Sequence, residues 1–153
     1  MPSSTDRIEK NVVINAPRHR VWNALADSQQ FGKWFGVKFS APFKPGAVLT
    51  GNITNKGYEH IEMSVWVETV EPDRELAFRW HPHAIDTTQD YTAEPTTLVT
   101  FTLDDAPDGT KLTVVESGFD QIPESRRQAA FTGNSEGWRQ QMERVRKYVD
   151  ANG

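Results

Sequence analysis

The chain has 153 residues, 17 Lys and Arg against 21 Asp and Glu for a net charge of −4, and no cysteine. This length fits one domain with a sizeable core. The lack of a basic segment argues against nucleic-acid binding. The lack of cysteine excludes disulfides and thiol catalysis. The N-terminal residues lack the apolar stretch of a signal peptide, and no apolar run approaches the ~20 residues of a membrane span, so we expect residues 1–153 to form a single cytoplasmic domain.

The first part of the chain predicts one strand followed by two short helices. Residues 7–15 alternate apolar and polar side chains, which is typical of a half-buried strand. Pro17 then suits the first turn of a helix, because its missing N–H needs no partner there, and an apolar stripe at helical spacing follows it. Asp27 or Ser28 can cap a second short helix that runs through residues 31–34.

The middle of the chain predicts a succession of strands joined by turns. Residues 36–45, which end at a Pro-Gly turn signal, are expected to form a connection. Alternating or largely apolar stretches predict five further strands, at 47–54, 59–70, 76–80, 97–103 and 110–117. Residues 81–95 contain two prolines among many polar residues and are expected to form a loop.

The stretch 123–149 is the only one long and periodic enough to predict a major helix. Its apolar residues recur at three- and four-residue steps with charged residues between them, so one face is expected to be buried. Gly133 and Gly137 weaken its middle, which allows a kink or a break within residues 132–135. Strands in hairpin succession give an antiparallel sheet with the helices on one face, so the expected fold class is α+β.

Five segments of the sequence carry a resemblance to a known family. They are VVINAPRHRVWNALADSQQFGKWFG (12–36), VEPDRELAFRWHP (70–82), TLVTFTL (97–103), DGTKLTVVESGFD (108–120) and GW (137–138). In this order and spacing they resemble the SRPBCC (START-like, helix-grip) superfamily, and more closely its branch related to the activator of heat-shock-protein-90 ATPase. The resemblance implies a curved antiparallel sheet of about six strands wrapped on the C-terminal helix, with a cavity between them. Lipid and small-molecule carriers, polyketide cyclases and co-chaperones all belong to the superfamily, so the fold leaves the activity open.

Glu116 is the most informative candidate functional residue in the sequence. It alternates with Leu112 and Val114, so it is expected on the concave side of the sheet, facing the helix. A carboxylate there has a raised pKa unless it is paired, and such groups cluster at functional sites. The alternative is that Glu116 lies at a strand end that is open to water, or that it pairs with an arginine.

Five tryptophans and eight phenylalanines are many for this length. Either they fill the core, or some of them line an apolar ligand pocket. The candidate ligand-binding residues are Trp34, Phe35, Trp80, His81, Phe101, Val114, Glu116, Phe119, Phe131 and Trp138.

Two other groups of polar residues are candidate sites. His81 and His83 could bind a metal ion, but no third ligand is evident, so no metal or other cofactor is expected. Tyr58, His60 and Glu62 would form an acid–base cluster if they faced inward. The aliphatic residues on the other face of the same strand are expected to face inward instead, because burial fixes strand register.

These observations favour a protein that binds a small apolar, aromatic or lipid-like molecule between the sheet and the long helix, oriented by Glu116 and His81. One alternative is a cyclase- or hydratase-type enzyme that uses Glu116 as a general base. The other is a co-chaperone-type interaction module with a chaperone partner. The sequence has no catalytic-triad, phosphate-loop or dinucleotide-binding pattern, and it specifies neither the ligand nor the oligomeric state.

Overall fold

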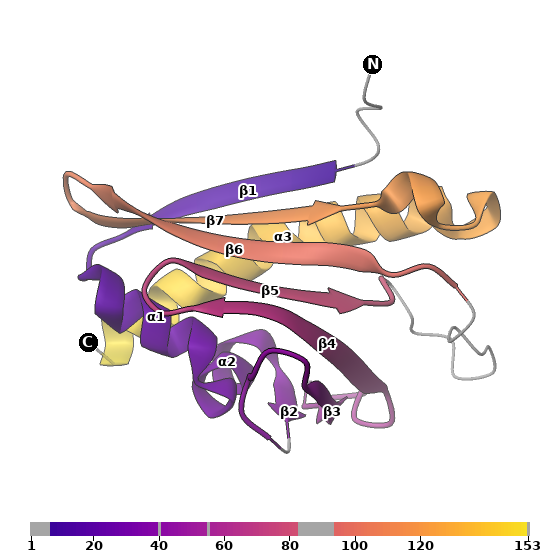
Figure 1. Ribbon diagram of the computed structural model, residues 1–153, viewed down its shortest axis with the longest axis horizontal. Helices are drawn as coiled ribbons and strands as arrows, with labels where there is room; N and C mark the ends of the chain where they lie inside the picture. The colour runs from indigo at the N-terminus through magenta and orange to yellow at the C-terminus, as the bar shows by residue number, and fades with distance from the viewer. Residues whose placement is uncertain (1–6, 40, 55, 83–93, 153) are drawn as a thin grey trace.

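The structure is a computed structural model that describes residues 7–39, 41–54, 56–82 and 94–152. These residues form one antiparallel sheet of seven strands in the order β1-β7-β6-β5-β4-β3-β2, and Figure 1 shows the long helix α3 running across one face of it. The strands are β1 (Arg7–Ile14), β2 (Val37–Phe39), β3 (Val48–Ile53), β4 (Glu62–Glu71), β5 (Glu75–Trp80), β6 (Thr97–Ala106) and β7 (Gly109–Ser117). The helices are α1 (Arg18–Ala26), α2 (Ser28–Phe35) and α3 (Glu124–Asn152), with a 3₁₀ turn η1 (Phe119–Gln121) before α3.

The α+β helix-grip architecture expected from the sequence is confirmed, with one strand added. The segment 36–45 was expected to be only a connection, yet it contains β2, which pairs with Gly51–Ile53 of β3. Three residues are too few to show an alternating pattern, so β2 is defined by its partner strand rather than by its own sequence.

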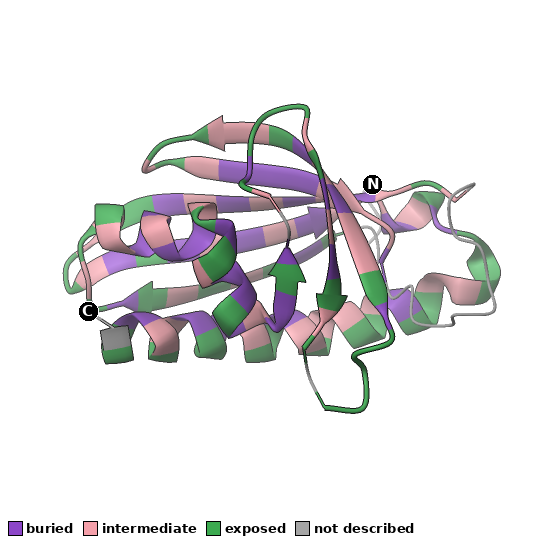
Figure 2. Ribbon diagram, turned by 90° about the horizontal axis from the view of Figure 1, so that it is seen from below, coloured by how far each residue is buried: buried purple, intermediate pink, exposed green. Residues whose placement is uncertain are grey.

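The break that the sequence allowed within residues 132–135 does not occur, because α3 is continuous from Glu124 to Asn152. Its buried residues, Ala130, Trp138, Met142, Val145 and Val149, form the predicted stripe toward the sheet. Gly133 and Gly137 each cost about 1 kcal/mol of helix propensity, which the packing of that stripe offsets. In Figure 2 the buried residues lie along the strands and on the sides of the helices that face them.

Short helices α1 and α2 cover the same face of the sheet as α3. Asp27 caps α2, as predicted, by accepting a hydrogen bond from the backbone N–H of Gln29 at 3.0 Å. Phe31 of α2 contacts the rings of Phe78 on β5 and Phe101 on β6, so α2 continues the core beside α3.

Strand register decides which side chains meet on the inner face. Glu116 of β7 lies opposite Ile8 of β1 and Val99 of β6. Trp80 of β5 lies opposite Thr97 of β6. Residues two apart on a strand share a face, so these side chains gather at one end of the sheet.

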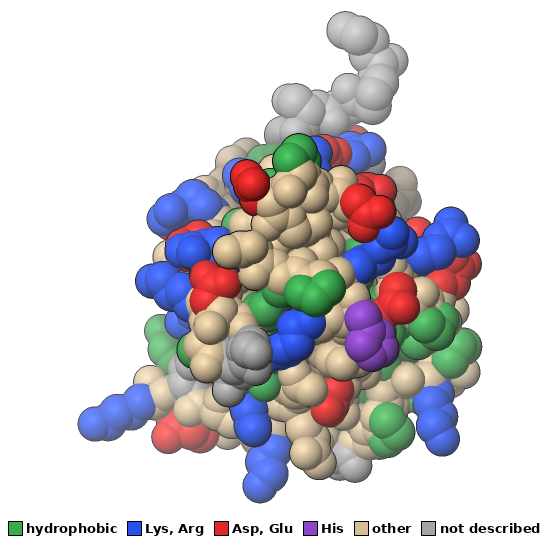
Figure 3. Space-filling model, turned by 90° about the vertical axis from the view of Figure 1, so that its left-hand side faces the viewer, with side chains coloured by type: hydrophobic (Ala, Val, Ile, Leu, Met, Phe, Trp, Pro, Cys, Tyr) green, Lys and Arg blue, Asp and Glu red, His purple; other side chains and the backbone are tan. Residues whose placement is uncertain are grey.

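On the face shown in Figure 3, Lys and Arg side chains are interspersed with Asp and Glu. In the part of the chain that the structure describes, no helix is both long enough and apolar enough to cross a lipid bilayer.

Candidate functional site

Glu116 is fully buried, and four side chains donate hydrogen bonds to its carboxylate. From the sheet, Oε2 accepts from Trp80 Nε1 at 2.7 Å and from Thr97 Oγ1 at 2.5 Å. From α3, Oε1 accepts from Trp138 Nε1 at 2.8 Å, and Asn134 Nδ2 lies 3.0 Å from Oε1 and 3.2 Å from Oε2. The carboxylate therefore joins three strands to the long helix.

The donors converge because of regular geometry rather than an unusual loop. Trp80 and Thr97 are cross-strand neighbours on β5 and β6, and β6 pairs with the strand that carries Glu116. Asn134 and Trp138 are four residues apart on α3, so they share one helix face. The site thus requires only strand alternation and one helical repeat.

Every donor to Glu116 is uncharged, and this sets the electrostatics of the site. Burial raises the pKa of the Glu116 carboxyl, and the hydrogen bonds from Thr97, Trp80, Trp138 and Asn134 lower it without offsetting burial. The sequence left two alternatives open for Glu116, and both are wrong. The residue does not lie at a water-exposed strand end, because it is fully buried. It does not pair with an arginine, because none of these donors is an arginine. The Glu116 carboxyl therefore takes up a proton more readily than an exposed glutamate does.

Aromatic rings enclose the carboxylate. Trp80 stacks on Trp138 with ring centroids 5.6 Å apart, and Phe35 lies 5.9 Å from Trp80 and 6.0 Å from Trp138. Phe101 packs its edge against Trp138 at 5.6 Å. These rings lie beside Glu116, where the family resemblance implies a cavity. Trp80 and Phe35 are only half-buried, so the cluster reaches the surface at these two residues.

The remaining candidate residues lie around this cluster. Val114 is fully buried opposite Phe101, and Phe119 and Phe131 form their own edge-to-face pair with centroids 5.5 Å apart. Trp34 is buried and donates its indole N–H to the carbonyl of Ala24 at 2.8 Å, so it braces α2 against α1.

His81 contacts Glu94 and Trp66. Its Nε2 lies 3.1 Å from the carbonyl oxygen of Glu94, and its ring packs edge-on against Trp66 at 5.4 Å. His83 lies outside the described residues, and the described residues contain no cluster of three or more His, Cys, Asp or Glu that could hold a metal ion.

Tyr58, His60 and Glu62 are exposed, so the acid–base cluster is absent from the interior. The predicted inward orientation of the aliphatic face is confirmed by Val65 and Val67, which are both buried.

Two donors to Glu116, Thr97 and Asn134, were not among the sequence candidates. The signals for both were present: Thr97 alternates with Val99 and Phe101, and Asn134 precedes Trp138 by one helical repeat. Neither residue is aromatic, so the aromatic pattern that predicts pocket residues does not include them.

A third missed feature is an ion pair beside the site. Arg126, in the first turns of α3, lies 2.7 Å from the Glu94 carboxylate and donates to the carbonyl of Pro82 at 3.1 Å. Both side chains of the pair are only 14% exposed. The pair fastens the start of α3 to the residues that follow β5 and precede β6, the strands that carry Trp80 and Thr97.

Comparisons with known proteins agree with this architecture. A family model described as "Activator of Hsp90 ATPase homolog 1-like protein" matches residues 15–150. Among curated proteins, no sequence matches the chain.

Several solved structures are similar over nearly the whole chain. Protein MLL2253 from Mesorhizobium loti is 26% identical, with 96% of this chain and 98% of that chain covered and a TM-score of 0.75. DynU16, encoded in the dynemicin biosynthetic locus, is 26% identical with a TM-score of 0.76; 99% of this chain is covered, but it spans only 49% of DynU16. The Aha1 dimer from Colwellia psychrerythraea shares the fold. It is 13% identical, with 94% of this chain and 95% of that chain covered and a TM-score of 0.69.

Proposed function

This chain belongs to the family of Activator of Hsp90 ATPase homolog 1-like proteins, and from that premise we propose that it binds a small, largely apolar molecule at the Glu116 end of the layer between the sheet and α3. The observation that supports this most is a fully buried carboxylate whose hydrogen-bond donors, among the residues that the structure describes, are all uncharged. Burying a carboxylate costs several kcal/mol, and an apolar residue at a purely structural position is often at least as stable. A function that needs an acceptor at this point accounts for its presence.

The chemistry of the site suggests the kind of molecule. An ionised carboxylate only accepts hydrogen bonds, so the ligand would carry a hydroxyl or an N–H group toward Glu116. Trp80, Phe35 and Asn134 are half-buried, so these are the side chains that would move to admit it. The apolar part of the ligand would then lie against the indoles of Trp80 and Trp138.

Native mass spectrometry of the protein purified gently from its own source tests this proposal. We expect the wild-type protein to carry a stoichiometric small molecule that Glu116→Gln loses. The matched control is Glu62→Gln, which removes a carboxylate that is exposed at the start of β4 and should leave retention unchanged. Equal retention by the wild-type protein and Glu116→Gln, or a wild-type protein that binds no component of the source extract, would contradict the proposal.

The same carboxylate supports a second candidate, an enzyme of the cyclase or hydratase type. A glutamate whose pKa is raised by burial suits a general base near neutral pH. If the retained molecule is a substrate, wild-type protein should convert it and Glu116→Gln should not. Equal conversion by the two proteins would exclude Glu116 as the base.

A chaperone partner is the candidate that the family description itself raises, since it names an activator of the Hsp90 ATPase. The test is whether the protein captures Hsp90 from a cytoplasmic extract and stimulates its ATPase. An unchanged ATPase rate at saturating protein would remove this candidate. Such a partner accords with the cytoplasmic location that we infer from the cysteine-free sequence.

A further inference from the structure

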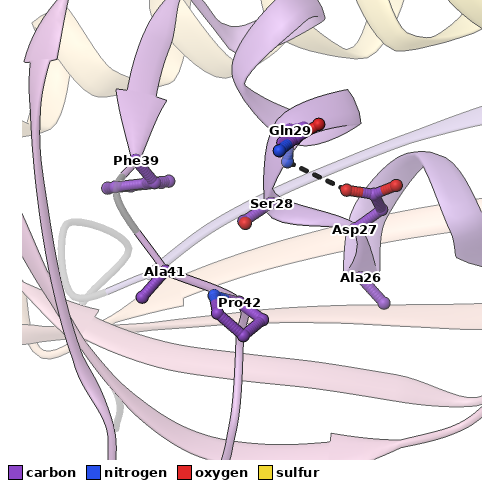
Figure 4. Close-up of a pocket in the computed structure, with 7 residues that line it drawn as sticks. All are labelled: Ala26, Asp27, Ser28, Gln29, Phe39, Ala41 and Pro42. Atoms are coloured by element: carbon purple, nitrogen blue, oxygen red, sulfur yellow. Dashed lines mark hydrogen bonds between the residues drawn. The ribbon is translucent and has the colours of Figure 1, made fainter.

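A cleft of about 330 Å³ lies between the start of α2 and the segment that follows β2. Its lining residues are Ala26, Asp27, Ser28 and Gln29 on one side, and Phe39, Ala41 and Pro42 on the other (Figure 4). The cleft is at the β2 edge of the sheet, whereas Glu116 lies on β7 near the opposite edge. None of its lining residues contacts the Glu116 carboxylate, so the two places are separate.

Ser28 presents a hydroxyl group to this cleft. The residue is only 7% exposed, and Figure 4 shows its hydroxyl pointing into the space between α2 and the opposite wall. The hydroxyl has no hydrogen-bond partner in the part of the chain that the structure describes. Because the rest of the residue is enclosed, a partner can reach this hydroxyl only through the cleft.

The charges around the cleft indicate what kind of molecule fits. Asp27 accepts from the backbone N–H of Gln29 at 3.0 Å and from the side chain of Gln30 at 3.2 Å, so its negative charge lies at the positive end of the α2 dipole. Among the residues that the structure describes, no Lys or Arg lines the cleft. An anion would therefore meet a carboxylate with no compensating cation.

The opposite wall is apolar. Phe39 is 8% exposed, and beneath it the rings of Phe31 and Phe43 lie 6.1 and 5.8 Å away, so the wall rests on a packed aromatic cluster. Pro42 adds a flat ring with no side-chain donor or acceptor. One face of the occupant must therefore be apolar, while the other meets the Ser28 hydroxyl.

We propose that this cleft is a second small-molecule site, for a neutral molecule with a compact ring and one hydrogen-bonding oxygen. The oxygen pairs with the Ser28 hydroxyl, and the ring lies against Phe39, Ala41 and Pro42. A volume of about 330 Å³ is at the lower end of ligand pockets, which limits the occupant to one or two rings. This site stands independently of the proposed function at Glu116.

Acetophenone, which combines a ring with a carbonyl oxygen, is the probe for this site, and benzoate is its anionic counterpart. Titration of ¹⁵N-labelled protein should give saturable amide shifts at Ala26 to Gln29 and at Phe39 and Ala41 with acetophenone, and none with benzoate. The indole N–H signals of Trp80 and Trp138 should stay in place. Shifts confined to those indoles, or equal binding of benzoate, would overturn the proposal.

Variants assign the binding to the hydroxyl. Ser28→Ala should weaken acetophenone binding roughly two- to tenfold, the loss expected for one neutral hydrogen bond. Ser125→Ala is the matched control, because it removes an exposed hydroxyl from the first turn of α3 and should change nothing. Ala41→Leu fills the cleft and should abolish the shifts, which keeps the test decisive if Ser28→Ala alters folding. Unchanged affinity in both Ser28→Ala and Ala41→Leu would refute the site.

Discussion

The indole N–H of Trp138 donates to Oε1 of Glu116 across 2.8 Å, so this hydrogen bond joins the middle of α3 to the end of β7, beside the bond from Asn134. Trp138 is 2% exposed and Glu116 is fully buried, so water does not compete for this bond. The packing of the helix on the sheet is thereby linked to the ionisation of one carboxyl group. Several consequences of that link can be measured.

Trp138→Phe keeps an aromatic ring and removes the donor. We expect it to lower the free energy of unfolding by about 1.5–3 kcal/mol near neutral pH, the range for a hydrogen bond to a charged group. The cost should shrink as the pH falls, because a protonated Glu116 needs the donor less. Urea unfolding at several pH values measures both effects.

Trp34→Phe is the matched control for that variant. Trp34 is 4% exposed and donates to the backbone carbonyl of Ala24, which does not titrate. The loss in free energy of unfolding caused by Trp34→Phe should therefore be independent of pH. A pH-independent cost for Trp138→Phe as well would show that the bond to Glu116 does not depend on its charge.

Glu116→Gln tests the pKa direction itself. The folded-state pKa of Glu116 is raised above its ordinary value of 4.5, so the folded protein holds this proton more tightly than the unfolded chain. The wild-type protein should therefore gain stability relative to Glu116→Gln as the pH falls from ~8 toward 4.5, and lose that gain as the pH rises through the folded-state pKa. A stability difference that is constant over this range, or that changes in the opposite direction, would contradict the assignment.

Thr97 and Thr110 offer a comparison between two fully buried strand threonines. Thr97 donates to the Glu116 carboxylate at 2.5 Å, and Thr110 donates to the backbone carbonyl of Ala16 at 2.8 Å. Thr97→Val should cost about 1.5–3 kcal/mol and Thr110→Val about 0.5–1.5 kcal/mol near neutral pH. Thermal unfolding of the two variants gives the comparison, and a larger cost for Thr110→Val would contradict it.

Two helix glycines should respond to alanine in opposite directions. A Cβ added at Gly137 meets no atom within 4 Å, so Gly137→Ala should stabilise the protein by about 0.5–1 kcal/mol. At Gly32 a Cβ would lie 2.1 Å from the carbonyl oxygen of Val37, so Gly32→Ala should destabilise by about 1–3 kcal/mol. Urea denaturation of both variants checks the two signs.

Local patterns predicted most of the fold and the orientation of the central carboxylate. Leu112, Val114 and Glu116 alternate on β7, and this alone predicts that Glu116 faces the helix, as it does. Strand alternation likewise places Thr97 on the inner face of β6, and the helical repeat places Asn134 on the same face of α3 as Trp138. These are two of the four donors to Glu116. What the sequence could not provide is the distance between elements, and hence which of the inward side chains meet.

Features that depend on tertiary contacts were not predictable. β2 is too short for a pattern and is defined by β3. The ion pair of Glu94 and Arg126 joins residues 32 positions apart, and nothing local links them. The continuity of α3 through Gly133 and Gly137 follows from packing on the sheet, which helix propensity does not include.

The indole region of the ¹H–¹⁵N spectrum, recorded while small-molecule extract of the source cells is added, tests the proposed binding site most directly. Trp80 and Trp138 donate their indole N–H groups to Glu116, whereas Trp34 of α2 donates to the backbone carbonyl of Ala24 in α1. If a molecule binds beside Glu116, we expect it to shift the Trp80 and Trp138 indole signals together and to leave the Trp34 signal in place. Binding that leaves both Trp80 and Trp138 unshifted, or no binding from any fraction of the extract, would contradict the proposal.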